Sequence, residues 1–327
     1  MNKIISKEQF SEKVFKLEIE APLIAKSRRA GHFVIVRVDE KGERMPLTIA
    51  GSNLEKGTIT LVVQTVGLSS TKLCKLNEGD YVLDVVGPLG QATHIQNYGT
   101  VVCAGGGVGV APMLPIIQAL KAAGNRVISV LAGRSKDLII LEEEVRASSD
   151  EVIIMTDDGS YGTKGLVTEG IESVIKREKV DKCFAIGPAI MMKFCCLLTK
   201  KYEIPTDVSL NTIMVDGTGM CGACRITVGG KTKFVCVDGP EFDGHQVDFD
   251  EMFKRMGSFK DVEREEMSHL EQHVCKVEPQ AEAKKSECKP CSEKACQMPM
   301  EELLDRKAPW REELRKAMKP KERTAIH

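Results

Sequence analysis

The sequence carries almost no net charge and has no long uninterrupted apolar run. Lysine and arginine together number 46 and aspartate and glutamate 47, which leaves a formal charge of −1. A chain without a basic excess gives no electrostatic reason to bind a polyanion, so we expect no nucleic-acid partner. The most apolar window, residues 101–120, is interrupted by glycines and prolines. It predicts a buried strand, loop and helix instead of a membrane span.

The sequence also lacks the features of a secreted protein. Its first ten residues, MNKIISKEQF, do not resemble a signal peptide. The twelve cysteines are unevenly spaced, and two of them, Cys195 and Cys196, are adjacent. This is not the pattern of a disulfide framework. We therefore expect a cytoplasmic protein whose thiols are free or bound to metal.

A chain of 327 residues with 42% hydrophobic side chains is long enough for two or three domains. Residues 1–96 contain short, partly alternating apolar runs separated by turns that contain glycine. Strands are expected at residues 15–19, 33–38, 58–63 and 81–86. Many short strands of this kind predict a closed antiparallel β-barrel as the first domain.

Residues 97–203 change to an alternation of strands and helices. Strands are expected at 101–104, 127–132, 152–156 and 182–186, and helices at 112–123, 138–147, 167–179 and 189–202. Strand–helix repeats of this size predict an α/β domain with a parallel sheet and helices on both faces.

A glycine-rich loop, AGGGVGVAP, follows the first of these strands and opens the first helix. Backbone N–H groups at such a helix N-terminus favour a pyrophosphate. Arg134, Asp157 and Gly187–Pro188 follow neighbouring strands, so we expect them at the same edge of the sheet. The pattern leaves alternatives open: a packing turn for the loop, a solvated surface charge for Arg134 and a turn-forming role for Asp157.

Residues 204–250 contain a spacing that is typical of iron–sulfur proteins. Cys221 and Cys224 form a C-x2-C pair, Cys236 follows twelve residues later, and Asp216 stands five residues before Cys221. Plant-type [2Fe–2S] sites have the spacing C-x4-C-x2-C with a distant fourth cysteine. The sequence therefore predicts this cluster with Asp216 in place of the first cysteine. Zinc, which also binds cysteine and aspartate, and free thiols stay open as alternatives.

A β-hairpin would bring the last cysteine back to the others. Residues 225–228 and 233–237 are expected as strands, and Gly229–Gly230 as the turn between them. Such a hairpin would return Cys236 to the loop that holds the C-x2-C pair.

The first domain has two stretches that could hold a cofactor with a phosphate group. One is RMPLT, residues 44–48, and the other is GLSST, residues 67–71, which is rich in hydroxyl groups and N–H donors. Ordinary barrel turns are the alternative for both.

Residues 251–327 are predicted to be a charged extension, partly flexible. A short helix is expected at 308–318. Cys288, Cys291 and Cys296 either bind a metal or are free thiols. We assign no catalytic nucleophile or acid–base pair, and His245, His269 and His273 are expected at the surface or in the tail.

The motifs RMPLTIA, GLSSTKL, GPLG, AGGGVGVAP and IGPAIMM, in this order, resemble the ferredoxin–NADP reductase superfamily. With the cysteine segment, residues 1–275 are similar to the electron-transfer subunit of NAD-dependent dihydroorotate dehydrogenase. Asp216 makes the chain similar also to the small (alpha) subunit of NADH-dependent ferredoxin:NADP oxidoreductase, the bifurcating enzyme, also called the sulfide dehydrogenase type.

The resemblance implies an electron-transfer flavoprotein subunit, an oxidoreductase that moves electrons between NAD(H) or NADP(H), FAD and a [2Fe–2S] cluster. Its partner would be a larger flavoprotein and iron–sulfur subunit, similar to the glutamate synthase small subunit and linked indirectly to ferredoxin. A dihydroorotate dehydrogenase catalytic subunit is the alternative partner. A zinc-stabilised scaffold subunit without redox function is the alternative from another class.

The resemblance also assigns residues to each cofactor. FAD would contact Pro46, Leu47, Thr48, Val62, Val63, Gln64, Ser69 and Ser70; the nicotinamide nucleotide would contact Gly105, Gly106, Gly107, Gly109 and Pro112; and Asp216, Cys221, Cys224 and Cys236 would hold the cluster. One position departs from the superfamily pattern. An arginine usually stands three residues before the hydroxyl residue, where this chain has Met45. Arg44 is one position out of register, which leaves its contact with the flavin phosphate open.

Overall fold

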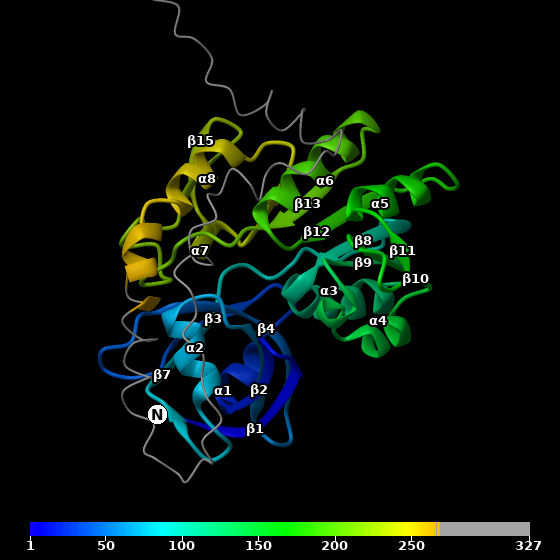
Figure 1. The fold of residues 1–327 in the computed structure, drawn as a ribbon. Coiled ribbons are helices and arrows are strands. Elements are labelled where there is room, and N and C mark those ends of the chain that lie inside the picture. Colours follow the sequence, from blue (N-terminus) through cyan, green and yellow to red (C-terminus); the bar gives the residue numbers. More distant parts are fainter. Residues whose placement is uncertain (266, 269–327) are drawn as a thin grey trace, which may run out of the picture. The chain divides into compact units, whose positions relative to one another are not determined.

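The computed structural model describes residues 1–265, 267 and 268 (Figure 1). This part of the chain contains two seven-stranded sheets and one two-stranded hairpin. None of its helices is both long and apolar enough to cross a membrane. The helix expected at 308–318, the cysteines of the tail, and His269 and His273 lie outside the described residues.

The first sheet is antiparallel and nearly closed, as the sequence predicts. Its strands are β1 (Asn2–Ser11), β2 (Val14–Glu20), β3 (Phe33–Arg37), β4 (Met45–Asn53), β5 (Thr58–Gln64), β6 (Tyr81–Val82) and β7 (Asp84–Leu89), in the order β6-β1-β2-β5-β4-β3-β7. Only Leu83 separates the two edge strands β6 and β7, so the chain itself brings the edges together. Two helices accompany the sheet, α1 (Pro22–Ser27) and α2 (Leu68–Lys75).

The barrel interior is filled by every second residue of its strands. Leu17 and Ile19 of β2 and Ile59 and Leu61 of β5 are fully buried in one cluster. Lys16 and Glu18 lie between or beside the buried positions of β2 and are not buried. Burying each of these aliphatic side chains contributes about 1.5–3 kcal/mol.

The second sheet has the order β11-β10-β9-β8-β12-β13-β16 and is parallel except at its last strand. Its strands are β8 (Thr100–Gly106), β9 (Arg126–Gly133), β10 (Glu151–Thr156), β11 (Thr163–Lys164), β12 (Lys182–Ile186), β13 (Thr206–Ser209) and β16 (Glu241–Asp243). Its helices are η1 (Gly107–Gly109), α3 (Val110–Ala122), η2 (Lys136–Leu138), α4 (Glu142–Ser148), α5 (Val167–Ile175) and α6 (Ala189–Lys201).

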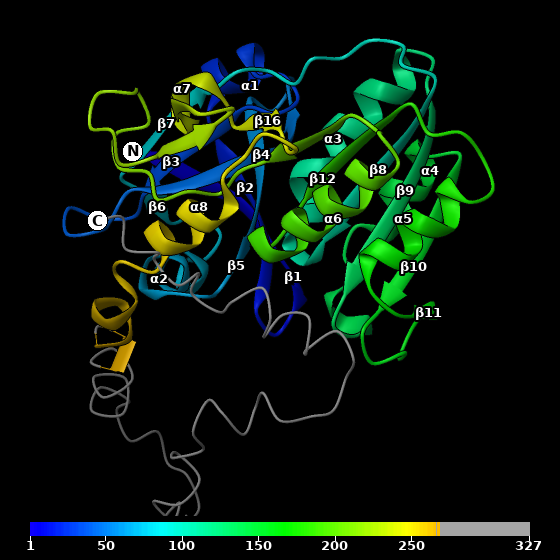
Figure 2. The same cartoon turned by 90° about the horizontal axis from the view of Figure 1, so that it is seen from above.

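Helices cover both faces of this sheet, with α3 and α4 on one face and α5 and α6 on the other (Figure 1 and Figure 2). The alternation along β8 explains the two layers, because neighbouring side chains point to opposite faces. Val102 packs in the cluster that contains α5 and α6, whereas Val101 and Cys103 pack in the cluster that contains α3 and Val145 of α4. The predicted α/β architecture is confirmed.

The segment with the predicted cluster ligands forms a hairpin, β14 (Arg225–Val228) and β15 (Lys231–Phe234), followed by α7 (Val235–Asp238) and, after β16, by α8 (Phe249–Met256). The predicted hairpin is present, but the strand expected at 233–237 is wrong in its second half, because a short helix begins at Val235. The carboxylate of Asp238 accepts a 2.7 Å hydrogen bond from the N–H of Phe234 and turns the chain there.

Strands β13 and β16 belong to the second sheet although both lie within residues 204–250. They pair antiparallel, with Ser209 opposite Glu241. The predicted cluster segment is therefore joined to the nucleotide sheet by backbone hydrogen bonds. The predicted boundaries at residues 96, 203 and 250 stay predictions.

Candidate cofactor sites

The carboxyl ends of four parallel strands meet at one edge of the second sheet. Gly105 of β8 pairs with Ile186 of β12, and Thr156 of β10 pairs with Gly133 of β9. The residues predicted for the nucleotide site lie at or just beyond these ends: Gly105, Gly106, Gly107, Gly109, Pro112, Arg134, Asp157, Gly187 and Pro188. The topology thus places residues that are up to 83 positions apart in the sequence at one edge.

Gly109 and Gly107 of the loop are glycines for different structural reasons. A β-carbon at Gly109 would collide with the carbonyl oxygen of Ile186 at the end of β12, so this glycine is required for close packing. Gly107 has a φ of +55°, and a β-carbon there would meet no atom within 4 Å. The backbone at Gly107 therefore faces open space directly before α3, where a ligand phosphate can approach the helix N-terminus.

Arg134 and Asp157 extend from the ends of the neighbouring strands β9 and β10. The N–H of Asp157 donates to the carbonyl of Gly133 (3.1 Å), which holds the two strand ends together. Asp157 is exposed as a residue, but its carboxyl group is partly desolvated, which raises its pKa above the ordinary value; the nearby Arg134 opposes this shift. Both side chains are exposed, which leaves them accessible to a nucleotide.

The predicted flavin strand β4 pairs with β3, with Pro46 opposite Ile35 and Thr48 opposite Phe33. Pro46, Leu47 and Thr48 are all half-buried. Helix α3, which follows the glycine loop, packs against this same strand. The predicted flavin and nucleotide sites therefore adjoin each other within residues 1–276.

Two residues predicted to contact FAD, Val63 and Ser70, have side chains that make other contacts. Val63 is 1% exposed and points into the barrel, while its neighbour Val62 packs towards α3. The hydroxyl of Ser70 accepts hydrogen bonds from the N–H groups of Val66 and Gly67, 3.1 Å each. Ser70 thus uses its side chain to begin α2, and only its backbone is left for a pyrophosphate.

The stretch expected to be a hydroxyl-rich turn is the first part of helix α2. A β-carbon at Gly67, the residue before the helix, would meet no atom within 4 Å. The first turn of a helix has N–H groups without intrahelical partners. Ser69 donates to the carboxylate of Glu43 (3.1 Å), so an acidic side chain lies beside this open end.

The four predicted cluster ligands form two pairs. Sγ of Cys224 lies 3.2 Å from Sγ of Cys236, and Sγ of Cys221 lies 3.3 Å from Oδ1 of Asp216. The first pair is buried and Cys221 is exposed. In the described part of the chain, no three His, Cys, Asp or Glu side chains are arranged to hold one metal ion. The donor set therefore has two pairs of ligands and no single four-ligand centre.

Asp216 organises the loop that carries the first pair. Its carboxylate accepts hydrogen bonds from the N–H groups of Thr218 (3.1 Å), Met220 (3.0 Å) and Cys221 (3.0 Å). The bonds from Thr218 and Cys221, with the one from the N–H of Thr218 as the largest contribution, lower the pKa of Asp216 to about 2. The side chain is therefore a carboxylate at neutral pH and a competent anionic ligand.

The second pair is held in a different environment. Burial and the neighbouring Cys224 raise the pKa of the Cys236 thiol to about 12. The N–H of Cys236 points to Sγ of Cys224 at 3.5 Å. An N–H group directed at a sulfur ligand is the kind of contact that tunes an iron–sulfur site.

Two contacts of the barrel with the cysteine segment were not predicted from the sequence. Arg44 donates from Nε to the carbonyl of Val215 (2.6 Å) and from Nη2 to that of Asp216 (3.3 Å). Gln91 donates from Nε2 to the carbonyl of Val237 (2.9 Å). The partners lie more than 140 residues apart in the sequence. The only indication in the sequence was that Arg44 stands one position away from the arginine of the superfamily motif.

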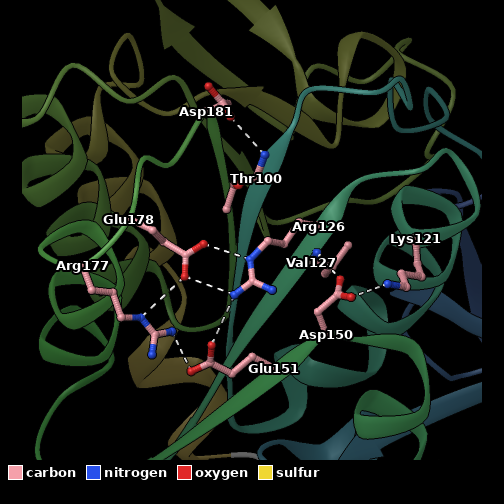
Figure 3. A network of polar contacts seen from close by, with 9 residues as sticks. All are labelled: Thr100, Lys121, Arg126, Val127, Asp150, Glu151, Arg177, Glu178 and Asp181. Atoms are coloured by element: carbon pink, nitrogen blue, oxygen red, sulfur yellow. Dashed lines mark hydrogen bonds and ion pairs between the residues drawn. The ribbon is translucent and has the colours of Figure 1, made fainter.

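The amino-terminal edge of the second sheet is closed by charged groups (Figure 3). The carboxylate of Asp181 accepts from the N–H of Thr100 (3.0 Å), and Arg126 pairs with Glu178 (2.9 Å). Figure 3 shows Glu178 between the guanidinium groups of Arg126 and Arg177. Each of these carboxylates thus has a backbone N–H or a guanidinium of the same edge as its partner.

Comparison with known proteins agrees with this geometry. Residues 211–248 match the family described as the iron–sulfur cluster binding domain of dihydroorotate dehydrogenase B. The chain is 50% identical over 264 residues to a protein of Thermotoga maritima named dihydroorotate dehydrogenase B (NAD(+)), electron transfer subunit homolog; the match covers 81% of this chain and 93% of that protein. An uncharacterized protein in the adh 3′ region of Clostridium beijerinckii is 46% identical, over 83% of this chain and 95% of that one.

A solved structure is similar over nearly all of its length. It comes from a study of flavin-based electron bifurcation in the NADH-dependent reduced ferredoxin-NADP oxidoreductase. The TM-score is 0.78 at 47% identity, and the match covers 82% of this chain and 98% of that one. The chain therefore belongs to the family of the dihydroorotate dehydrogenase B electron transfer subunits and is an oxidoreductase of the ferredoxin–NADP reductase type.

Proposed function

We propose that the chain is an electron-transfer flavoprotein subunit that uses NAD(P)H, FAD and a [2Fe–2S] cluster. The pairing of the four donors carries this proposal. Asp216 lies with Cys221, and Cys224 lies with Cys236, and no third such side chain in the described residues joins either pair. One zinc ion needs four donors around one point, whereas two irons need two protein ligands each. The arrangement supports the cluster over the zinc scaffold.

The residues of this chain would bind and orient the cofactors. When bound, FAD accepts a hydride from the reduced nicotinamide, and the cluster accepts single electrons. Strand β4, through Pro46, Leu47 and Thr48, would hold the flavin against the barrel. The open backbone at Gly107 and the N-terminus of α3 would bind the pyrophosphate of the nucleotide. Because α3 packs on β4, this nucleotide would lie beside the flavin strand.

The remaining residues would each make one kind of contact with FAD or with the nucleotide. Val62 and Gln64 would bracket the flavin with their side chains, and Ser69 and Ser70 would offer backbone N–H groups of the first turn of α2. Arg134 would bind a phosphate group of the nucleotide, and Asp157 would bind a ribose hydroxyl. No residue of the chain is assigned as a nucleophile or as a general acid.

We further propose a cytoplasmic heterodimer with a larger flavoprotein and iron–sulfur subunit, through which electrons reach ferredoxin and NADP. The similarity to the ferredoxin-NADP oxidoreductase structure, at 47% identity, supports this partner. A dihydroorotate dehydrogenase catalytic subunit is the second candidate, and the name of the Thermotoga maritima relative supports it.

The proposed function is tested on protein purified without oxygen. We expect about two irons, two acid-labile sulfides and one FAD per chain, and a loss of visible absorption when NADH is added. Protein that contains zinc and no flavin would contradict the proposal. Mass spectrometry of proteins co-purified from the native host distinguishes the two partners.

A further inference from the structure

Arg44 connects the predicted flavin strand to the predicted cluster loop. It directly precedes β4 and therefore stands two residues before Pro46. Its guanidinium donates to the carbonyl oxygens of Val215 (2.6 Å) and Asp216 (3.3 Å). The two carbonyls belong to the backbone of the first cluster ligand and of the residue before it.

The same part of the loop is packed against the barrel directly beyond this contact. Gly217 has a φ of +76°, and a β-carbon there would lie 2.8 Å from Leu89 and 2.9 Å from Ile35. These side chains belong to the neighbouring strands β7 and β3. The loop is therefore fixed to the barrel by one guanidinium and by one close backbone contact.

The charge of Arg44 is not neutralised by an acidic partner within the described residues. The ion pairs in this part of the chain do not include it. Its two acceptors are carbonyl oxygens, which carry only partial charge. A half-buried cation with neutral partners acts over a longer distance than one that is paired with a carboxylate.

We propose that Arg44 is a positioning residue for the iron–sulfur centre. It holds the ligand loop at the start of β4, and its positive charge favours the reduced cluster, because reduction adds a negative charge next to it. The proposal rests on the proposed function, since it requires a cluster at Asp216, Cys221, Cys224 and Cys236. It assigns to Arg44 a role towards the cluster and none towards the flavin phosphate.

The experiment compares the wild-type protein with Arg44→Gln, Arg44→Lys and Lys56→Gln. Lys56 follows the far end of β4 and is exposed, so its variant removes the same charge away from the loop. Each protein is titrated electrochemically, and the reduced cluster is followed by electron paramagnetic resonance. Hydrogen exchange of residues 214–223 is measured separately on protein freed of iron by a chelator.

At the wild-type midpoint potential, we expect the ratio of reduced to oxidised cluster to fall about threefold or more in Arg44→Gln. The ratio should stay within about twofold in Arg44→Lys, which keeps the charge, and in Lys56→Gln. The amide hydrogens of the loop should exchange faster in both Arg44 variants. Neither glutamine nor lysine has a guanidinium that can donate to both carbonyl oxygens at once. If Arg44→Gln binds no iron while Arg44→Lys does, the role of the charge is supported, because lysine keeps the charge and loses the two carbonyl contacts.

An Arg44→Gln protein with a wild-type midpoint, or with an unchanged rate of loop exchange, would overturn the proposal. Wild-type protein without iron would instead overturn the proposed function, and the charge effect with it. Iron content is measured on every protein, so the two failures are distinguishable.

Discussion

Oγ1 of Thr93 donates a 2.7 Å hydrogen bond to Oε1 of Glu241 and thereby joins the segment after β7 to the edge strand β16. Burial, with a smaller contribution from Asp207, raises the pKa of Glu241 to about 7, although Thr93 and Lys182 act in the opposite direction. The folded protein therefore binds this proton more tightly than the unfolded chain, in which the pKa of glutamate is 4.5.

The raised pKa of Glu241 predicts how the stability of the protein depends on pH. The contribution of Glu241 is fully present below pH 4.5 and is lost as the pH rises through 7. Glu241→Gln, which mimics the protonated acid, should lack this loss and should be more stable than wild type at pH 8 by about 3 kcal/mol. Urea unfolding at pH 5, 6, 7 and 8 measures the difference. The exposed Glu55→Gln is the control. If the free energy of unfolding changed with pH in the same way in wild type and Glu241→Gln, the raised pKa of Glu241 would be contradicted.

Removal of one cysteine of the buried pair should abolish the cluster. Cys236→Ala leaves Cys224 without its neighbour 3.2 Å away, so one iron would lose a ligand, and we expect iron per chain to fall more than fivefold relative to wild type. Cys196→Ala is the matched control, because Cys196 is also buried but lies on α6. Equal iron contents in the two variants, measured after anaerobic purification, would refute the ligand assignment.

Gly217 and Gly230 allow backbone strain to be separated from packing. Their φ values are +76° and +75°, but a β-carbon at Gly230 meets nothing within 4 Å, whereas one at Gly217 meets Leu89 and Ile35. Gly230→Ala should cost about 1 kcal/mol of unfolding free energy. Gly217→Ala should cost about 2–4 kcal/mol, because strain and overpacking add. Denaturant unfolding of both proteins checks this, and equal losses would show that the barrel contact is loose.

The nucleotide loop can be tested at its open position. Gly107→Ala places a methyl group where the backbone is free of neighbours, so it should weaken NADH binding about tenfold or more while lowering the unfolding free energy by only about 1 kcal/mol. Fluorescence titration with NADH measures the dissociation constant. Gly230→Ala serves again as the control for strain, and unchanged binding in Gly107→Ala would place the pyrophosphate elsewhere.

The architecture was accessible from the sequence because its signals are local, and the ligand assignment, which stays a prediction, rests on a local spacing as well. Alternation predicted the barrel strands, and the spacing of Asp216, Cys221 and Cys224 placed these three predicted donors on one short loop. The placement of Cys236 depended only on a hairpin that returns the chain to the loop, and the two glycines at the turn indicated that hairpin. The nucleotide edge followed from one rule, that parallel strands end on the same side.

Features that depend on the hydrogen bond of a single side chain, on one unusual backbone angle or on a tertiary contact were not accessible. The run Val235–Val237 has strand propensity, but the carboxylate of Asp238 binds the N–H of Phe234 and starts a helix instead. The GLSST stretch has turn composition, yet Ser70 caps its own helix. Helix α4 begins only at Glu142, later than the sequence indicates, because Leu141 adopts a left-handed conformation with φ +55°. The partner of Arg44 lies 171 residues away.

Strand β16 follows Cys236 in the chain and pairs with the last parallel strand of the second sheet. The segment that carries the predicted cluster ligands, here called the cysteine module, is consequently not structurally independent of the second sheet. A chain that ends before Glu241 would leave the backbone donors and acceptors of β13 open to solvent, and such an unprotected edge invites association between copies. Transplanting this module onto another reductase would therefore require its terminal strand to be carried along with the ligands.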